Sequence, residues 1–109
     1  MEETILKIST DYTENPGGRE KKEGKFSGEE FREKFLEPFF KTKKENSKLI
    51  IDLDGLSGYP SSFFEEAFGG IARIYSPQEV LDTIRFICND NPIVIDEMIS
   101  YINQEYAKR

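Results

Sequence analysis

The chain has 109 residues, which is the usual size of one compact domain. It contains no histidine and a single cysteine, so histidine-based catalysis, histidine-ligated zinc and a disulfide framework are excluded. The net charge of -6, which arises entirely within residues 49–109, argues against binding to nucleic acid, because nucleic-acid-binding proteins usually present a basic face.

The first expected element is a β-hairpin over residues 4–25. Residues 4–9 place apolar side chains on one side, as a strand does. A turn follows at Asn15-Pro16-Gly17-Gly18, because proline fixes φ and glycine permits positive φ. Arg19 comes just after this turn, where it is either a surface residue of the hairpin tip or a contact for an anion or a partner's carboxylate.

A helix is predicted over residues 27–40. Ser27 and Glu30 have the spacing of a capping box, in which each side chain accepts a hydrogen bond from the other residue's backbone N–H. Pro38 interrupts the helical pattern, so a kink or break is expected near Glu37. The apolar stripe of this helix consists of Phe31, Phe35 and Phe39.

A buried strand is predicted over residues 49–54, followed by a second helix over residues 62–74. The strand is an apolar run with little alternation, which is typical of strands covered on both faces. Ser62 and Glu65 form a second capping box at the start of the helix. The pair Gly69-Gly70 is unfavourable inside a helix, and it indicates close packing against a neighbour or an early helix end.

The last expected elements are a strand over residues 83–88 and a helix over residues 92–107. In the strand, successive side chains alternate between two faces, with Ile84, Phe86 and Cys88 on one of them. The helix begins at Asn91-Pro92, where Asn91 is the N-cap and Pro92 is the first helical residue. The complete order is ββαβαβα. It predicts a single α/β domain over residues 1–109, a small sandwich in which helices pack on a mixed sheet of about four strands.

The segment from Gly55 to Phe63 joins the central strand to the second helix and contains the adjacent serines Ser61 and Ser62. Sites in open α/β sheets form at the carboxyl ends of strands, where loops meet helix N-termini. A phosphate on either serine would be stabilised there, because free N–H groups and the helix dipole favour an anion. A structural explanation fits as well: Ser62 is then the N-cap and Ser61 fills a turn.

Four motifs carry a family resemblance: Pro16-Gly17-Gly18-Arg19, Phe26-Ser27-Gly28-Glu29-Glu30-Phe31, Asp52-Leu53-Asp54-Gly55 and Gly58-Tyr59-Pro60-Ser61-Ser62-Phe63-Phe64-Glu65-Glu66-Ala67-Phe68-Gly69-Gly70. With them, most of the chain resembles the STAS-like domains of unknown function, which are related to the anti-sigma-factor-antagonist (STAS) domains. The antagonists carry an Asp-Ser-Ser-Gly motif at the start of their second helix. It falls here on Pro60-Ser61-Ser62-Phe63, so the serine pair alone is retained.

The resemblance implies a non-enzymatic regulatory module that binds a protein partner. In the antagonist family, the serine loop docks on a histidine-kinase-like (GHKL) ATPase that acts as a serine kinase, and phosphorylation of the first serine breaks the complex. Ser61, with Ser62 second, is therefore the expected phospho-acceptor. Tyr59 and Phe63 are expected to form an exposed aromatic patch beside it. The expected partner-binding residues are Asp54, Gly58, Tyr59, Ser61, Ser62, Phe63 and Glu66.

Two other functions stay open. Asp52 and Asp54 resemble the Asp-x-Asp motif of haloacid-dehalogenase-type phosphatases, which would make the protein a small Mg²⁺-dependent phosphohydrolase. In that motif the first aspartate is the nucleophile and the second is the acid/base, although strand-end aspartates also simply cap loops. A small-molecule or nucleotide sensor is the other alternative, because STAS-type folds are able to hold nucleotides.

The sequence also sets expectations for location and cofactors. No apolar run is long enough to cross a bilayer, and the N-terminus lacks the pattern of a signal peptide. We therefore expect a soluble, cytoplasmic protein that contacts neither a membrane nor nucleic acid. The leading interpretation assigns no catalytic residue, no metal and no cofactor, and nothing in the sequence indicates the oligomeric state.

Overall fold

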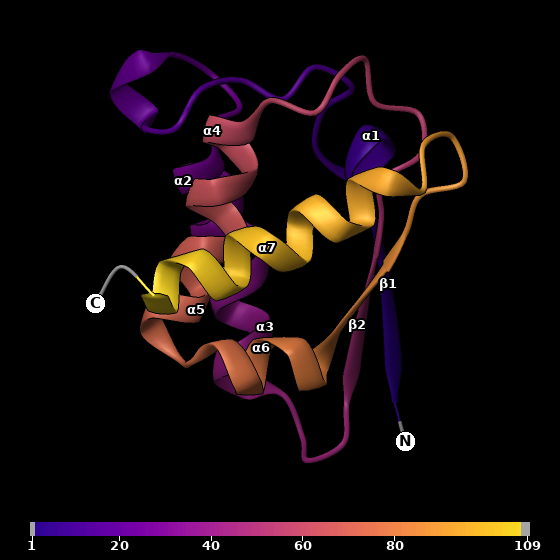
Figure 1. Cartoon of the computed structure of the whole chain (residues 1–109), viewed down its shortest axis with the longest axis vertical. Helices are drawn as coiled ribbons and strands as arrows, with labels where there is room; N and C mark the ends of the chain where they lie inside the picture. The colour runs from indigo at the N-terminus through magenta and orange to yellow at the C-terminus, as the bar shows by residue number, and fades with distance from the viewer. Residues whose placement is uncertain (1, 108–109) are drawn as a thin grey trace.

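The fold is built on a small, fully parallel sheet (Figure 1). The computed structural model describes residues 2–107, with side chains as far as residue 103. Three strands pair in the order β1-β2-β3, so that β2 is central. They are β1 (Glu3–Lys7), β2 (Lys48–Asp52) and β3 (Ile84–Ile87).

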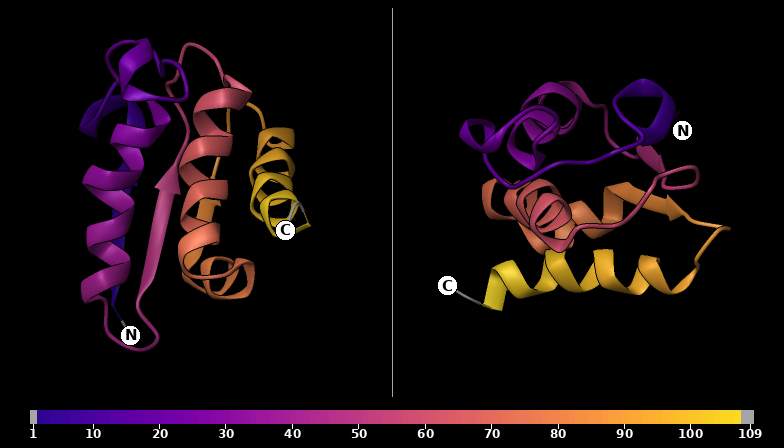
Figure 2. Two further views of the ribbon diagram at one scale, coloured as in Figure 1. Left: turned by 90° about the vertical axis from the view of Figure 1, so that its left-hand side faces the viewer. Right: turned by 90° about the horizontal axis from the view of Figure 1, so that it is seen from above.

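The long helices lie on one face of this sheet, so the molecule has two layers (Figures 1 and 2). Leu49 and Ile51 of β2 face the helices and are buried, whereas Ile5 and Ile87 lie on the opposite face and are exposed. The helical segments are α1 (Ile8–Asp11), η1 (Lys21–Glu23), α2 (Gly28–Phe31), η2 (Arg32–Leu36), α3 (Glu37–Thr42), α4 (Ser61–Phe64), η3 (Glu65–Gly69), α5 (Gly70–Ile74), α6 (Pro77–Thr83) and α7 (Ile93–Ala107).

Two long helices each combine three of these segments, over residues 28–42 and residues 61–74. The middle segment of each, η2 or η3, is a π turn. In the first helix the Glu37 N–H donates to the Arg32 carbonyl oxygen five residues earlier. Pro38 has no N–H and its ring presses on the preceding turn, so the wider π turn relieves the conflict. Of the kink or break expected near Glu37, the break does not form, because the helix continues through a π turn.

Aromatic side chains fill the space around these two helices. Phe31, Phe63, Phe64 and Phe68 are fully buried. The ring centroids of Phe31 and Phe63 lie 5.7 Å apart, and those of Phe63 and Phe64 lie 4.9 Å apart. Because burial of one such side chain contributes about 1.5–3 kcal/mol, this cluster is a major source of the fold's stability.

Glycines let the two helices approach each other closely. A Cβ atom added to Gly28 would lie 2.2 Å from the carbonyl oxygen of Phe63, and one added to Gly70 would lie 2.6 Å from the Arg32 guanidinium. Gly70 therefore confirms the close packing that the sequence indicated for the pair Gly69-Gly70. The helix continues through both glycines to residue 74.

The hairpin expected over residues 4–25 does not form. The described residues contain three strands, not about four, and the order ββαβαβα is not observed. After Lys7 the backbone turns into α1, where the N–H groups of Tyr12 and Thr13 both donate to the Ile8 carbonyl oxygen, at 2.9 and 2.8 Å. β1 needs no neighbour in sequence, because its partner is the distant strand β2.

Residues 13–27 instead form a loop that lies against the start of α2. The Gly17 N–H donates to the Phe26 carbonyl oxygen, and the Gly28 N–H donates to the Gly18 carbonyl oxygen, both at 2.9 Å. Pro16, Gly17 and Gly18 therefore form a turn in a loop that packs against a helix. Such a loop needs the same turn residues as a hairpin.

α6 is absent from the elements predicted above, although its signals are in the sequence. The Ser76 Oγ accepts a hydrogen bond from the Glu79 N–H at 3.1 Å, and Pro77 occupies the first helical position. The strand expected over residues 83–88 is correspondingly shorter, because Thr83 ends α6.

Tyr12 fastens this N-terminal part of the chain to α2. Its hydroxyl donates to the Glu30 carboxylate at 2.5 Å and lies 3.3 Å from the Ser27 carbonyl oxygen. Burial, followed by the hydrogen bond to Glu30, raises the pKa of Tyr12 well above its ordinary value. The phenol therefore stays protonated in the folded protein at pH values where it ionises in the unfolded chain.

This difference predicts a loss of stability in alkali that depends on Tyr12. Above pH 10, the ordinary tyrosine pKa of about 10 lets the unfolded chain release a proton that the folded protein retains, so the free energy of unfolding falls as pH rises. Tyr12→Phe should cost about 1–2 kcal/mol at pH 8, because the Glu30 carboxylate loses its donor. Urea unfolding at pH 8, 9, 10 and 11 should then show a shallower decline for the variant, and parallel declines would contradict this role.

Candidate functional site

The loops at the carboxyl ends of the three strands meet at one end of the sheet (Figure 1). Residues 53–60 connect β2 to α4, residues 88–92 connect β3 to α7, and α1 follows β1 directly. Open parallel sheets place their binding sites at this end. The segment that the sequence singled out therefore lies where a site is expected.

Asp54 ties these loops together. Its Oδ1 accepts a hydrogen bond from the Asp90 N–H at 2.8 Å, and its Oδ2 accepts one from the Asn89 side-chain amide at 3.0 Å. The Ser9 hydroxyl donates to the Asp54 carbonyl oxygen at 3.1 Å, and the Gly55 N–H donates to the Asp90 carboxylate at 3.0 Å. The segments after all three strands thus hold the loop over residues 53–60 in place. The partners of Asp54 in these contacts, Ser9, Asn89 and Asp90, are not among the site residues predicted from the sequence.

The two aspartates of the Asp-x-Asp motif have structural partners. The Asp52 Oδ1 accepts a hydrogen bond from the Asp54 N–H at 2.9 Å, and both carboxylate oxygens of Asp54 accept hydrogen bonds from the residues after β3. Within residues 2–103, no group of three or more histidine, cysteine, aspartate or glutamate side chains gathers to hold a metal ion. These hydrogen bonds account for the positions of both carboxylates.

The serine pair begins the second long helix. The helix starts at Ser61, and its N-cap is Pro60, which makes no side-chain capping bond. Ser62 is therefore not the N-cap that the sequence suggested, since the helix begins one residue earlier than expected. Ser61 is exposed and Ser62 is partly exposed. The first turn of this helix has no side-chain acceptor at its N-cap.

The expected aromatic patch is not present on the surface. Phe63 is fully buried, and its ring lies against those of Phe31 at 5.7 Å and Tyr12 at 6.4 Å. Tyr59 is partly buried and packs against the core, with its ring centroid 6.5 Å from that of Phe64. Phe63 thus belongs to the core, and an exposed pair with Tyr59 does not form.

Tyr59 also connects the loop to the end of β3. Its hydroxyl lies 3.5 Å from the Cys88 sulfur, and Cys88 is buried, as the sequence predicts. The hydrogen bond to Cys88, followed by burial, raises the pKa of Tyr59 to about 12. Tyr59 therefore remains a neutral phenol at physiological pH and anchors the loop.

Glu66 lies in an ion-pair network between the two long helices. Its carboxylate contacts Arg32 at 2.5 Å, and Arg19 and Arg73 at 3.7 Å each. Arg32 also contacts Glu37 at 2.9 Å. Burial alone lowers the pKa of Arg32, but the hydrogen bonds to Glu37 and Glu66 outweigh it and raise the pKa above its ordinary value. Glu66 was expected to contact a partner, but its carboxylate is engaged within the fold.

Arg19 makes its carboxylate contact inside the chain. Its guanidinium lies 2.7 Å from the Glu65 carboxylate. Its backbone N–H donates to the Glu23 carboxylate at 2.7 Å, and its carbonyl oxygen accepts from the Glu29 N–H at 3.0 Å. Arg19 therefore fixes the loop over residues 13–27 against the two long helices.

The predicted site residues separate into two groups. Gly58, Ser61 and Ser62 remain accessible at the carboxyl end of the sheet, and a Cβ atom on Gly58 would meet nothing within 4 Å. The other expected contacts are turned inward or bonded within the fold: Asp54, Tyr59, Phe63 and Glu66. The accessible surface of the site is therefore the loop after Gly55 and the first turn of α4.

A family model described as a STAS-like domain of unknown function (DUF4325) matches residues 27–94. The matched segment runs from the N-cap of α2 to the beginning of α7 and includes β2, β3 and the loop over residues 53–60. No curated protein and no solved structure matches the chain significantly. None of the helices within residues 2–107 has the length and apolar character that a membrane span requires.

Proposed function

The chain belongs to the family of STAS-like domains of unknown function, and on this basis we propose that it is a non-enzymatic regulatory module that binds a protein partner. The proposed partner is a histidine-kinase-like ATPase with serine kinase activity. It would contact the accessible surface over residues 55–62. Ser61 is the proposed phospho-acceptor, with Ser62 as the second candidate.

The exposure of Ser61 is the observation that carries this proposal. Its hydroxyl stands at the first position of a long helix, at the end of a loop that Asp54 fixes to two other strand ends. A kinase needs access to the hydroxyl, and a partner needs a surface of fixed shape. Ser61 supports both requirements, whereas Phe63 and Glu66 are occupied by the fold.

Phosphorylation at Ser61 would act as a charge switch. A phosphate group adds a charge of about -1.5 to -2 at neutral pH. The free N–H groups in the first turn of α4 would stabilise that charge, because Pro60 supplies no side-chain acceptor. The same charge would oppose an interface that is built around a neutral hydroxyl, so the partner would be released.

The proposal predicts a specific pattern of partner capture. Wild type, Ser61→Ala and Ser61→Asp, each immobilised, would be incubated with a lysate of the host cell and Mg-ATP, and bound proteins identified by mass spectrometry. We expect a histidine-kinase-like ATPase on wild type and Ser61→Ala, and at least tenfold less on Ser61→Asp. Equal capture by all three would refute the switch, and absence of any such ATPase would refute the partner.

Ser57→Asp is the matched control for added charge. Ser57 is exposed in the same loop, and its backbone N–H donates to the Glu14 carbonyl oxygen, which the substitution leaves in place. If Ser57→Asp retains the ATPase while Ser61→Asp loses it, the effect belongs to position 61 and not to the charge of the loop. Equal loss from both variants would show nonspecific repulsion.

A further inference from the structure

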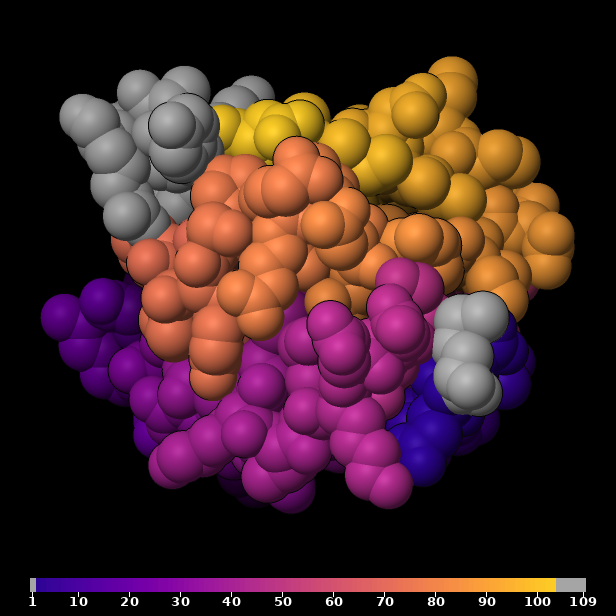
Figure 3. All heavy atoms as spheres, turned by 90° about the horizontal axis from the view of Figure 1, so that it is seen from below, coloured from indigo at the N-terminus to yellow at the C-terminus, as the bar shows by residue number. Residues whose placement is uncertain are grey.

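A second site is indicated at the opposite end of the sheet. A pocket of about 400 Å³ lies between α6 and the segment that joins α3 to β2. Its wall includes Ser47 and Lys48, where β2 begins, and Thr83, just before β3. Seen from below, the segment over residues 43–48 and α6 lie side by side on this face (Figure 3). The loop that leads to Ser61 lies beyond the other ends of the same strands.

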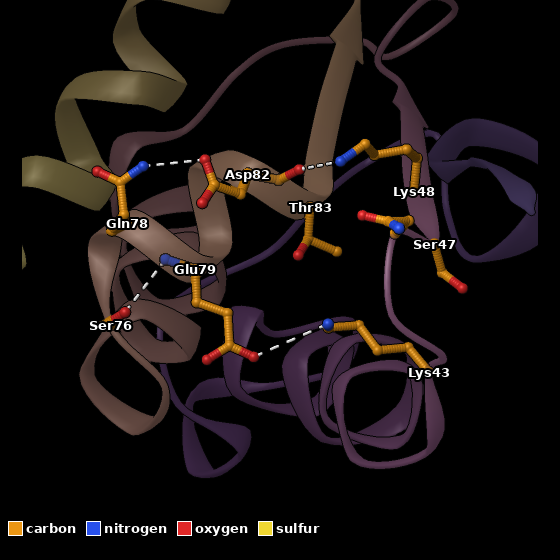
Figure 4. A pocket seen from close by; sticks show the side chains of 9 residues that line it. Lys43, Ser47, Lys48, Ser76, Gln78, Glu79, Asp82 and Thr83 are labelled. Carbon is orange, nitrogen blue, oxygen red and sulfur yellow. Dashed lines mark hydrogen bonds and ion pairs between the residues drawn. The ribbon is translucent and has the colours of Figure 1, made fainter. Parts of the chain in front are cut away.

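Two largely buried residues with hydroxyl groups, Ser47 and Thr83, line this pocket. Ser47 is 6% exposed and Thr83 is 4% exposed. Neither hydroxyl forms a hydrogen bond with any of the described residues, and neither is fully enclosed. Figure 4 shows the Thr83 hydroxyl directed into the space between Glu79 and Lys43. Because the Thr83 hydroxyl is not fully enclosed, solvent reaches it, and it is free to bond to an occupant of the pocket.

Two lysines stand on the same wall. The Lys43 side chain is 17% exposed, and its ammonium lies 3.9 Å from the Glu79 carboxylate. The Lys48 ammonium donates to the Asp82 carbonyl oxygen at 2.6 Å. Each ammonium has three N–H groups, so each retains donors after these contacts. In Figure 4 the two lysines extend toward α6 on either side of Thr83.

The backbone on both sides of the pocket adopts unusual conformations. Asn46 has a φ of 70° and Ser76 has a φ of 153°, which places two of the three described non-glycine residues with positive φ at this pocket. Residues other than glycine adopt such angles at a cost, and the surrounding structure must hold them there. Two segments with positive φ therefore shape the walls of the pocket.

We infer that this pocket binds a small molecule through an oxyanion, either a phosphate or a carboxylate. The hydroxyl of Thr83 and the ammonium groups of Lys43 and Lys48 donate to the oxyanion. Glu79 competes with the oxyanion for Lys43, because its carboxylate lies 3.9 Å from the Lys43 ammonium. The site does not depend on the proposed role of Ser61.

The test titrates the protein with inorganic phosphate and, separately, with acetate. Binding is measured through the changes in the backbone amide NMR shifts. The expected result is saturable shifts at Ser47, Lys48 and Thr83 with one or both probes, and their relative affinity distinguishes phosphate from carboxylate. Thr83→Val and Lys48→Met should each weaken binding about tenfold, and Glu79→Gln should strengthen it several-fold. Lys44→Met is the matched control, because Lys44 is highly exposed in the same segment and does not line the pocket.

Each remaining outcome would overturn the inference. Shifts that do not saturate, or that Lys44→Met reduces as much as Lys48→Met, would show general screening of charge. The melting temperature of Thr83→Val gives a second readout that needs no ligand. It should equal or exceed that of wild type, since the substitution removes a hydroxyl with no partner in the fold. A clear decrease would show that the fold itself uses the hydroxyl.

Discussion

Phe63→Ala should lower the free energy of unfolding by about 3–5 kcal/mol, as is typical when a fully buried phenylalanine is truncated. The ring is completely inaccessible and packs against Tyr12, Phe31 and Phe64. Its removal would leave a cavity between the two long helices, which cannot close without moving both. Urea or guanidinium unfolding followed by circular dichroism measures the change through the midpoint of the transition.

Phe26→Ala is the matched control, because it truncates the same type of side chain at an exposed position. Phe26 is 40% exposed and touches Tyr12 edge-on, with ring centroids 5.3 Å apart, so its truncation should cost no more than about 1 kcal/mol. If Phe63→Ala were as stable as Phe26→Ala, the Phe63 ring would not be part of the core. The ring would then be available for an interface.

Gly28→Ala should destabilise the protein by about 3 kcal/mol, at the upper end of the usual effect of overpacking. The added Cβ would lie 2.2 Å from the carbonyl oxygen of Phe63 and 3.0 Å from the Cβ of Glu66. A backbone oxygen cannot rotate away, so the two helices would have to separate. Alanine is the better helix former, and intrinsic propensity alone therefore predicts the opposite sign. The same unfolding experiment decides between them.

Gly58→Ala tests whether the effect is specific to the helix crossing. A Cβ at Gly58 would meet nothing within 4 Å, and the backbone there is not left-handed. This substitution should be neutral or should stabilise the fold by up to about 1 kcal/mol, through lower entropy of the unfolded chain. A loss of stability at Gly58 comparable to that at Gly28 would contradict the steric explanation.

Local signals predicted the interior of the fold better than its N-terminal part. The long helix with Ser27 as its N-cap and the central strand follow from capping chemistry and apolar patterning, and the structure confirms both. The family followed from its resemblance in four motifs, and the family model confirms it. The turn signal at Pro16-Gly17 was real, but a turn does not specify what comes after it. Here the chain returns to a helix and not to a second strand, because β1 takes its partner from residues 48–52.

The candidate site was harder to predict, because its residues meet only in three dimensions. Helical periodicity indicates one buried face, and Phe64 and Phe68 have its four-residue spacing whereas Phe63 does not. The helix lies between two neighbours, however: Phe63 packs on Phe31, while Phe68 packs on Phe86 of β3 with ring centroids 5.1 Å apart. A helix in this position is apolar on two faces, and Phe63 belongs to the second. Similarly, no local pattern links Asp54 to Asp90.

The all-parallel sheet has a consequence for how the protein folds. Leu6 pairs with Ile51, and Ile51 pairs with Phe86, so no strand pairs with its neighbour through a short turn. Each pairing closes a crossover that contains a long helix, and closing such loops costs chain entropy before any strand contact compensates for it. Sheet formation is therefore coupled to packing of the helices around the phenylalanine cluster, and we expect the chain to fold more slowly than a helical bundle of the same length, because its strand pairings are non-local.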